Sequence, residues 1–557
     1  MKKSIYRKYM IRGFAAVLFP ALLMLQACVP ALLPEGGTSG SGEALPGSGS
    51  APDGETSAGS VTEDTAPAIP PGAAILTDYA GASNGGADWA PAVEEAFRHS
   101  DTVFIPEGEY LMSEVKLSSG QTLRGAGSET VIIQKDDAER LFNISGSRRK
   151  VSDLAADKED FSDSFLLKKT EMLKPGDRIF LLGQRNAMIL EDDGREWCLG
   201  RSYAAGTACF YSEFLTVASV SEQDGGTLVR TTSGTVFPFY YADGRRESDP
   251  LKPTSQSATG WPYRRAATTC WKMDMAKDVA IKDMTVKNAH GYSIYALWAD
   301  SLSLSGLTVM SPEDRAPEAN SPFVRMLECL DSTVSGCVFS VPVKPDAGAI
   351  KAAGMDMFGS YNMLWILSSS GCGFDGCSID FGTHCIAFGK KHGEGVNTGC
   401  FVRNCRVTGA VWSGIFVAQG SYDTELSGNT VSGCPLGIMT AGRKTLIADN
   451  SLSGPGIATE DYSYMKSAEG GTSAIVLTEG YSFDATVVRN RADGFDTGLL
   501  IRDGYEKTNV FDGIDVEFRD NRMTVLKNGT FVWKNRFNTS AKSMVVPSEG
   551  NEIVKTG

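Results

Sequence analysis

The sequence predicts an all-β protein whose chain winds into a parallel β-helix, and two repeating patterns support this prediction. In the first pattern, a short apolar strand leads to a fixed position that holds Met, Leu, Cys or Asn, and another strand follows. The interval between fixed positions is as short as 21 residues, from Asn429 to Asn450, and as long as 40 residues, from Cys337 to Cys377. Such intervals are typical of coils with loops of variable length. The fixed positions are Met284, Leu307, Cys337, Cys377, Cys405, Asn429, Asn450, Asn490 and Asn521.

The second pattern is a further short strand between successive fixed positions. Turns rich in Gly, Asn and Asp separate these strands, and no helical period lies between them. The chain therefore leaves no room for the crossover helices of an α/β fold. These second strands cover residues 294–296, 364–366, 385–388, 414–417, 437–439, 474–477 and 498–501.

Stacked coils place equivalent side chains in ladders with a spacing of about 4.8 Å. We expect the Asn column, from Asn429 to Asn521, to lie inside the coils, where the amides satisfy one another and the turn backbone. The Met, Leu and Cys positions form the apolar continuation of the same column.

Composition and charge exclude several classes of protein. The chain has 557 residues, 42% of them hydrophobic and 22% charged, which excludes collagen, a coiled coil and wholesale disorder. Its formal net charge of −14 repels phosphate backbones, so we expect no nucleic-acid partner. No second long apolar stretch follows the N-terminal segment, which argues against a multispan membrane protein.

The N-terminal segment reads as an export signal. In residues 1–27 a basic stretch precedes the apolar run 14–25, which is short for a spanning helix and typical of a signal peptide. The sequence Leu25-Gln26-Ala27-Cys28 resembles a bacterial lipobox, which implies lipidation of Cys28 and a stable membrane anchor. Residues 28–72, rich in Gly, Ser, Pro, Ala and Thr, then form a flexible tether. We expect an exported lipoprotein at the outer membrane or cell surface, with residues 73–557 as a monomeric β-helix domain.

The start of this domain carries a family resemblance. Residues 77–82 (Thr-Asp-Tyr-Ala-Gly-Ala) precede an amphipathic segment from Trp89 to Phe97, a strand ending in Ile105-Pro-Glu-Gly-Glu-Tyr110 and the sequence Leu-Arg-Gly-Ala-Gly at 123–127. This order resembles the opening of the pectate-lyase-like superfamily of single-stranded right-handed β-helices. The resemblance implies right-handed coils and an N-terminal capping helix, which Asp88 is placed to cap. The superfamily includes lyases, hydrolases, epimerases and phage tailspikes, so it predicts the fold and leaves the reaction open.

Residues 165–265 break the coil rhythm and are expected to form a β-rich insertion beside the first coils. Within it, Cys198 and Cys209 are the candidate disulfide pair of an exported protein. The cysteines at the fixed positions are instead expected to stay reduced inside the coils. No C-x-x-C or H-E-x-x-H spacing occurs, which argues against a zinc site.

The coil pattern places His290, Asn362, His384 and Ser413 in one column. A lyase acting on a uronate-containing glycan needs a base for the C5 proton, and a cation or Ca²⁺ for the sugar carboxylate. His384 is the candidate base.

The predicted cations lie just after His384. Lys390, Lys391 and His392 form a basic patch with it, and Lys390 or Lys391 is the candidate partner of the sugar carboxylate. The alternative is that these are solvated turn residues.

Further candidates lie on neighbouring coils. Asp356 and Asp380 are the acids nearest to this patch in coil order; they are candidate Ca²⁺ ligands or the acid and base of a hydrolase, or else turn residues. Trp365 and Trp412 either stack on sugars or cover the sheet. Glu328 is expected in the same column as Lys390 and, like His290, is a candidate substrate-binding residue.

Two segments resemble elements of polygalacturonases but depart from them. Residues 382–388, Gly-Thr-His-Cys-Ile-Ala-Phe, resemble the family's Gly-Asp-Asp-Cys-Ile-Ala-Ile, with Thr383 and His384 in place of both aspartates. The stretch His290-Gly-Tyr-Ser-Ile resembles a second element but precedes the first segment instead of following it. Hydrolysis needs two carboxyl groups at the glycosidic bond, so these departures argue against a polygalacturonase.

The sequence therefore predicts a surface-anchored protein that binds an extended acidic polysaccharide across coils 285–420 and cleaves it as a lyase. The alternatives are a glycoside hydrolase using Asp356 and Asp380, and a glycan-binding or adhesive β-helix without turnover. Ca²⁺ is the one candidate cofactor.

Overall fold

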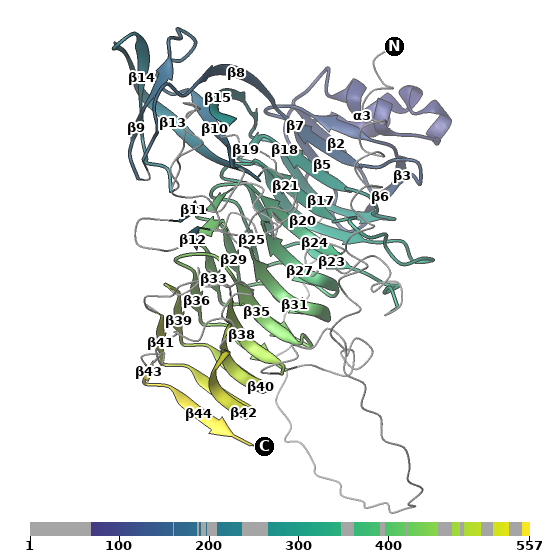
Figure 1. Cartoon of the computed structure of the whole chain (residues 1–557). Helices are drawn as coiled ribbons and strands as arrows, with labels where there is room; N and C mark the ends of the chain where they lie inside the picture. Colours follow the sequence, from purple (N-terminus) through teal and green to yellow (C-terminus); the bar gives the residue numbers. More distant parts are fainter. Residues whose placement is uncertain are drawn as a thin grey trace, which may run out of the picture. The chain divides into compact units, whose positions relative to one another are not determined.

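A computed structural model shows the predicted right-handed parallel β-helix (Figure 1). Its strands stack into three parallel columns that belong to one 32-stranded sheet. All described residues lie in one unit, Thr65–Gly557. The structure describes residues 68–159, 161–185, 189–190, 196–197, 209–236, 266–346, 361–389, 396–418, 420–454, 471–478, 484–502, 516–533 and 548–556.

The first and second columns form two of the walls of the coil. The first consists of β1 (Ala74–Ile75), β2 (Thr102–Ile105), β5 (Thr122–Gly125), the starts of β17 (Ala280–Lys287) and β20 (Ser303–Met310), β22 (Thr333–Ser335), β25 (Gly373–Asp375), β29 (Phe401–Arg403), β33 (Glu425–Ser427), β36 (Leu446–Ala448), β39 (Thr486–Val488), β41 (Glu517–Arg519) and β43 (Ser548–Glu549). The second consists of β3 (Gly108–Met112), β6 (Thr130–Gln134), the ends of β17 and β20, β23 (Val338–Ser340), β26 (Ser378–Ile379), β30 (Arg406–Thr408), β34 (Thr430–Ser432), β37 (Ser451–Ser453), the starts of β40 (Arg491–Arg502) and β42 (Arg522–Trp533), and β44 (Glu552–Lys555).

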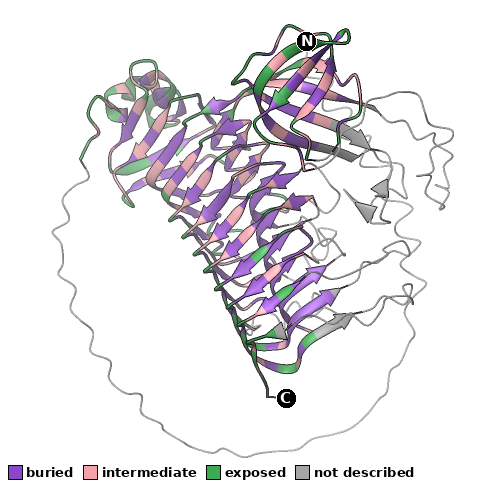
Figure 2. Ribbon diagram, turned by 90° about the vertical axis from the view of Figure 1, so that its left-hand side faces the viewer, coloured by how far each residue is buried: buried purple, intermediate pink, exposed green. Residues whose placement is uncertain are grey.

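The third column carries the candidate site. It consists of β4 (Val115–Leu117), β7 (Phe142–Ser145), β18 (Ile294–Leu297), β21 (Val324–Leu327), β24 (Asn362–Leu367), β27 (Gly382–Phe388), β31 (Ala410–Val417), β35 (Leu436–Thr440), β38 (Ser473–Thr478) and the ends of β40 and β42. Short parallel pairs join the turns after it, namely β16 (Ala276–Lys277) with β19 (Ala299–Asp300) and β28 (Asn397–Thr398) with β32 (Ser421–Tyr422). Buried residues make up much of the three columns (Figure 2), and their apolar side chains form one core cluster.

A residue with left-handed backbone makes the corner between the first and second columns. For L-residues this conformation costs roughly 1–2 kcal/mol, less for Asn and Asp, whereas Gly adopts it without this cost. From β17 onward the predicted fixed position follows this corner residue in each described coil. The corner residue is Gly, Asp or Asn except at Arg489, which explains why the sequence repeats these residues just before the fixed position. The corner residues are Asp283, Gly306, Gly336, Gly376, Asn404, Gly428, Asp449, Arg489, Asp520 and Gly550, with φ between 53° and 66°.

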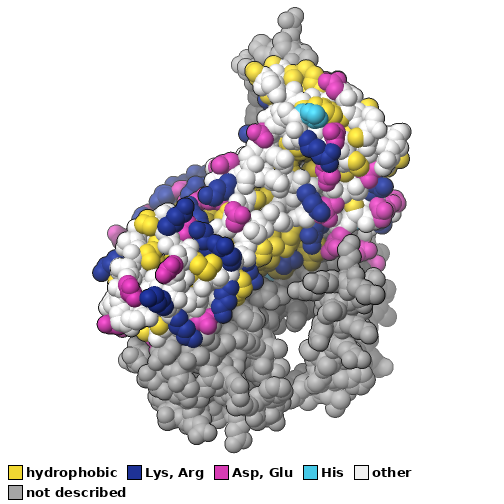
Figure 3. Space-filling model, turned by 90° about the horizontal axis from the view of Figure 1, so that it is seen from above, with side chains coloured by type: hydrophobic (Ala, Val, Ile, Leu, Met, Phe, Trp, Pro, Cys, Tyr) yellow, Lys and Arg dark blue, Asp and Glu magenta, His cyan; other side chains and the backbone are white. Residues whose placement is uncertain are grey.

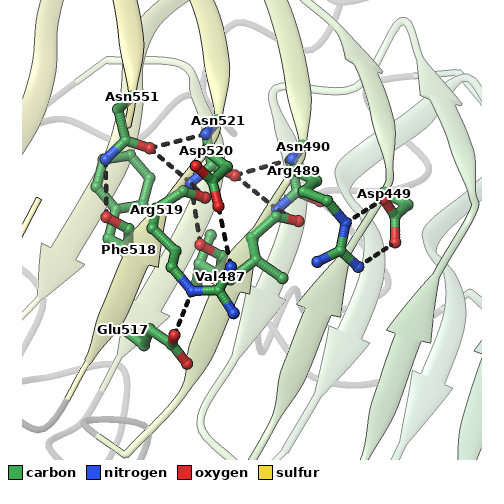
Figure 4. A network of polar contacts seen from close by, with 11 residues as sticks. Asp449, Val487, Arg489, Asn490, Glu517, Phe518, Arg519, Asp520, Asn521 and Asn551 are labelled. Atoms are coloured by element: carbon green, nitrogen blue, oxygen red, sulfur yellow. Dashed lines mark hydrogen bonds and ion pairs between the residues drawn. The ribbon is translucent and has the colours of Figure 1, made fainter. Parts of the chain in front are cut away.

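The predicted asparagine ladder is confirmed, and it is longer than predicted. Each side-chain oxygen accepts the backbone N–H of the preceding coil's ladder residue, as Asn490 Oδ1 does from Asn450 N at 3.0 Å. Each Nδ2 donates to the next oxygen, as Asn490 does to Asn521 at 3.0 Å (Figure 4). Asn551 continues the ladder and accepts from Asn521 N at 2.9 Å. Its sequence Gly550-Asn551 repeats Gly428-Asn429, a signal that the sequence analysis missed.

The apolar part of the column is also confirmed. Met284 pairs with Leu307, and Cys337, Cys377 and Cys405 are buried and carry free thiols, as predicted. The ladder changes type where Cys405 N donates to Asn429 Oδ1 at 2.9 Å.

An N-terminal cap covers the first coils, as expected. The cap consists of η1 (Leu76–Ala82), η2 (Asn84–Gly86) and α3 (Ala90–Ala96). Asp88 lies one residue before the N-cap, Trp89, and its Oδ1 accepts both Ala90 N at 3.1 Å and Ser113 N at 3.0 Å. Asp88 therefore ties the helix to the first coil as well as capping it.

The insertion is a separate antiparallel sheet and is larger than the predicted 165–265. Its strands run in the order β8 (Ser147–Asp153), β15 (Ala266–Asp274), β10 (Arg178–Arg185), β13 (Cys209–Gln223), β14 (Gly226–Thr231) and β9 (Ser164–Lys168), and β11 (Ile189–Leu190) pairs with β12 (Glu196–Trp197). It begins directly after β7, because Gly146 alone separates β7 from β8. Phe180 and Met273 pack against Leu330 of the solenoid. Lys and Arg side chains gather over this lobe (Figure 3).

Several predicted features lie outside the described residues. These are the signal peptide, Cys28, most of the tether and Cys198. Cys209 begins β13, but its side chain is not described, so the Cys198–Cys209 pair stays a prediction. No helix among the described residues is long and apolar enough to cross a membrane.

We predict that Asn490→Ala lowers the free energy of unfolding by about 3 kcal/mol, because each buried N–H or carbonyl left without a partner costs roughly 1–3 kcal/mol. Asn490 bonds to Asn450, Asn521 and Ile447 and is fully buried. Asn551→Ala is the control, expected to cost about 1 kcal/mol because water reaches that half-buried position. Urea unfolding measures both; equal small losses would contradict an internal ladder.

Candidate functional site

One line of side chains runs across the outer face of the third column. Tyr295 pairs with Arg325, Arg325 with Trp365, and Trp365 with Ala387. Alternate residues of these strands, such as Ile294, are fully buried in the core, so this line faces outward. We call it the outer line; it continues through Phe416, Met439, Val476 and Leu500.

Exposure divides the outer line into two parts. Tyr295 and Arg325 are only half-buried, whereas Trp365 is 5% exposed and Phe416 4%. The coils from β7 to β21 therefore offer the accessible polar and aromatic part of this face. From β24 to β38 the strands of this column are buried on both faces.

The predicted alignment of Asn362, His384 and Ser413 is confirmed by the strand register. A β-carbon added to the neighbouring Gly414 would meet Val431 of the core at 2.4 Å, so Ser413 beside it points to the outer face. His384 Nδ1 lies 2.6 Å from Ser413 Oγ, and its ring stacks on Phe416 with centroids 4.5 Å apart. His384 is only 1% exposed.

Asn362 leaves a polar atom without a partner at this position. Its side chain is 3% exposed, and Oδ1 is buried with no hydrogen-bond partner among the described residues. Such an acceptor costs free energy in the folded protein. A hydroxyl group of a ligand would satisfy it.

His290 does not join this alignment. The strand register places Ile294 beside Val324, and Val324 beside Leu364, so Tyr292 occupies the position equivalent to Asn362. His290 lies two residues earlier, in the turn before β18, where its Nδ1 is 2.6 Å from Asn288 O. The prediction for its position was wrong because the β17–β18 turn is longer than the pattern assumed.

Glu328 belongs to a cluster at the end of β21. It accepts a hydrogen bond from Trp298 Nε1 and lies 3.8 Å from Arg148 Nη1. Burial raises the pKa of the Glu328 carboxyl, outweighing the Trp298 hydrogen bond and the charge of Arg148, which act to lower it. Arg148 also lies over the rings of Trp271 and Trp298. Glu328 thus joins the solenoid to the insertion.

Neither predicted tryptophan platform has an open face in this structure. Trp365 donates from Nε1 to Gly389 O at 2.8 Å, and Arg325 lies over its ring at 5.0 Å. Trp412 is 8% exposed and belongs to the core cluster. Both rings therefore cover the sheet, the second of the two alternatives.

Asp380 has a structural position at a coil corner. Its carboxylate accepts from Val341 N at 2.9 Å and from Ser340 Oγ at 3.1 Å, which ties two coils together. Asp356, Lys390, Lys391 and His392 lie outside the described residues, so their predicted roles stay predictions. The described residues contain no group of three or more His, Cys, Asp or Glu side chains arranged to hold a metal, and the Ca²⁺ expectation stays open with Asp356.

Sequence reasoning missed a cluster of arginine and tyrosine residues at the accessible end of the outer line. The guanidinium carbon of Arg140 lies 4.3 Å from the Tyr295 ring centroid, and that of Arg325 lies 5.9 Å from it. Arg325 also lies 5.1 Å from the Tyr292 ring. Tyr295 was within a predicted strand, so its outward position was available as a signal. Arg140 precedes β7, and the strand of Arg325 was not recognised.

Comparison with solved structures shows the β-helix fold. The Gp54 tailspike of Acinetobacter baumannii bacteriophage AP22, in complex with A. baumannii capsular saccharide, matches with a TM-score of 0.51 and 11% identity, over 87% of this chain and 69% of that one. The tailspike gp61 of Pseudomonas phage phi297 matches with a TM-score of 0.52 and 12% identity, over 86% and 84%. No protein-family model and no curated protein matches the sequence. At these identities the similarity extends to the fold alone.

We predict that Glu328→Gln stabilises the protein at pH 8 and that this gain disappears as the pH falls towards 4. A carboxyl group whose folded pKa is raised contributes stability below its unfolded pKa and loses it as the pH rises through the folded pKa. The neutral amide keeps an acceptor for Trp298 without a buried charge. Thermal unfolding across this pH range measures the difference.

Glu425→Gln is the matched control with the opposite sign. A hydrogen bond from Arg403 holds the pKa of Glu425 below its usual range. Its stabilisation is therefore present above the unfolded pKa and lost as the pH falls through the folded pKa. We expect Glu425→Gln to destabilise at pH 8, with a smaller effect at pH 4. The same sign for both variants would contradict these assignments.

Proposed function

We propose that this chain binds an extended acidic polysaccharide across the outer face of the third column and cleaves it as a lyase. The observation that carries this proposal is the outer line, which places the half-buried Tyr295 and Arg325 on successive coils about 4.8 Å apart, with Trp365 supporting Arg325 from the next coil. A regular array of this kind suits a polymer that runs along the coils.

The fold comparison supports a glycan as the ligand. The AP22 tailspike carries a capsular saccharide on the same fold, although its 11% identity to this chain transfers no residue roles. We further propose that the chain belongs to the pectate-lyase-like superfamily, on the resemblance at residues 74–135.

The chemistry proposed for His384 is proton abstraction. The base removes the C5 proton of a uronate, the C4–O bond breaks, a C4=C5 double bond forms, and the leaving oxygen takes up a proton. Ser413 would hold the imidazole through Nδ1. Lys390 or Lys391 is the predicted cation for the sugar carboxylate. Arg325 is a described cation two coils from His384; its register partner on β27 is Ala387, three residues along the strand, so the two lie about 14 Å apart.

A glycan-binding protein without turnover is the second candidate, and the burial of His384 favours it. An imidazole that is 1% exposed and stacked on Phe416 also suits a packing role. A hydrolase is less well supported, because Asp380 is engaged by Ser340 and Val341.

The test is to incubate the full chain with a panel of acidic and neutral polysaccharides and to weigh the products. A lyase gives unsaturated products that absorb ultraviolet light and are lighter by one water than hydrolytic ones. We predict that His384→Ala lowers kcat at least about 100-fold, the scale of general acid–base catalysis.

His99→Ala is the matched control, since His99 lies on the exposed surface after α3, far along the solenoid from His384. We expect it to retain full activity. Full activity of His384→Ala would exclude the proposed base, and binding without any product would support the second candidate.

We also propose that the protein is an exported bacterial lipoprotein anchored through Cys28, on the sequence argument alone. We predict that Cys28→Ser abolishes incorporation of labelled palmitate and releases the protein from the membrane fraction. Unchanged labelling of the variant would contradict the anchor.

A further inference from the structure

The accessible end of the outer line holds two arginines around one tyrosine ring. Arg140, in the turn before β7, and Arg325, on β21, both lie within 6 Å of the Tyr295 ring centroid. Their guanidinium carbons are therefore no more than about 10 Å apart. We call Arg140, Tyr295 and Arg325 the arginine–tyrosine site.

Among the residues that the structure describes, neither arginine has an acidic partner. Ion pairs occur at many other arginines, as between Arg148 and Glu328, but none involves Arg140 or Arg325 among the described residues. The Nε atoms of both are buried without a hydrogen-bond acceptor. In a chain with a net charge of −14, two adjacent unpaired guanidinium groups stand out.

Nearby groups do not neutralise this charge. Glu328 follows Arg325 by three residues, but Trp298 and Arg148 engage its carboxyl group. Burial raises the pKa of Tyr295, even though Arg325 and Arg140 act to lower it, so the phenol stays neutral. Two like charges on either side of the Tyr295 coil repel each other, and an anion that reaches the N–H edges of both guanidinium groups would reduce the repulsion.

The aromatic rings fix the guanidinium groups in place. Arg325 lies 5.1 Å from the Tyr292 ring centroid and 5.0 Å from that of Trp365, and Tyr292 meets Tyr295 edge-on at 5.9 Å. Stacked guanidinium groups lose little freedom on binding and keep their N–H edges for a planar or tetrahedral oxyanion. The cation–π contacts occupy the ring faces, so an anion bound at the N–H edges fits better than a sugar stacked on the rings.

We propose that the arginine–tyrosine site binds the anionic group, carboxylate or sulfate, of one sugar of an acidic glycan. This inference rests on the proposed function, because it places the charged group of that polysaccharide on coils β7 to β21. In this inference Arg140 and Arg325, at the half-buried end of the outer line, bind the anionic group in place of Lys390 and Lys391.

The experiment compares the affinity of the full chain for polygalacturonate, a sulfated cellulose and neutral dextran. Charge-assisted hydrogen bonds are worth roughly 1.5–3 kcal/mol, so we expect Arg140→Gln and Arg325→Gln each to weaken binding of the acidic glycan at least about 10-fold. Dextran binding should not change. The ratio of polygalacturonate to sulfated cellulose affinity tells whether the anion is a carboxylate or a sulfate.

Arg149→Gln is the matched control, because it removes one exposed positive charge from β8 without touching Tyr295. We expect its affinity to stay within twofold of the parent. Arg140→Lys and Arg325→Lys keep the charge but lose the two-pronged geometry, and we expect intermediate affinities. If thermal unfolding shows that a Gln variant does not fold, the Lys variant at the same position replaces it in the binding test.

Each outcome has a definite meaning. Acidic-glycan affinities of Arg140→Gln and Arg325→Gln within twofold of the parent overturn the inference. Binding of dextran but of neither acidic glycan overturns it and leaves polysaccharide binding intact. A parent protein that binds none of the three overturns both the inference and the proposed function.

Discussion

The left-handed corner between the first and second columns is the constraint on which this structure depends. From β17 onward it turns each coil from the first column into the second at the same point, so that the following residue faces the core. A one-residue slip would turn the buried side chains of a strand outward. The interior ladder and the outer line are thus two consequences of one register. The corner tolerates Arg489 because its guanidinium forms two hydrogen bonds with Asp449 of the preceding coil (Figure 4).

The ladder changes chemistry along the solenoid while keeping its geometry. In the N-terminal coils Met and Leu fill the position by packing, and the Cys thiols also donate weakly to backbone carbonyls, as Cys377 does to Val334 O at 3.3 Å. From Asn429 onward each amide bonds to the next coil and to backbone carbonyl groups. Amide ladders specify the register more strongly than apolar packing, since a shifted coil would bury unpaired N–H groups. The C-terminal coils therefore have their register fixed by hydrogen bonds, and the N-terminal coils by the cap and the core.

Charge distribution separates the structural from the candidate functional parts of the surface. Most described arginines on this acidic protein pair with carboxylates, within the insertion, between coils or at the joint with the solenoid. Arg140 and Arg325 instead stack on tyrosine rings. The stacking stabilises them without cancelling their charge, which is what an anion-binding surface requires. The insertion begins directly after β7, so its edge lies next to this surface.

The sequence by itself determined the repeating coil. The corner residue follows from local backbone preference, and the position after it follows from burial, so each coil shows both in its own sequence. It also placed Asn362, His384 and Ser413 in one line. Only the tertiary structure decided which of these groups are exposed and what they contact. His290 was wrongly predicted to align with these residues, because strand periodicity does not reveal the length of the turn before β18. Trp365 became a support for Arg325 because residues 40 positions apart meet only when coils stack. The arginine–tyrosine site was out of reach for the same reason: it joins side chains from three coils, and no local pattern records the absence of an acid beside them.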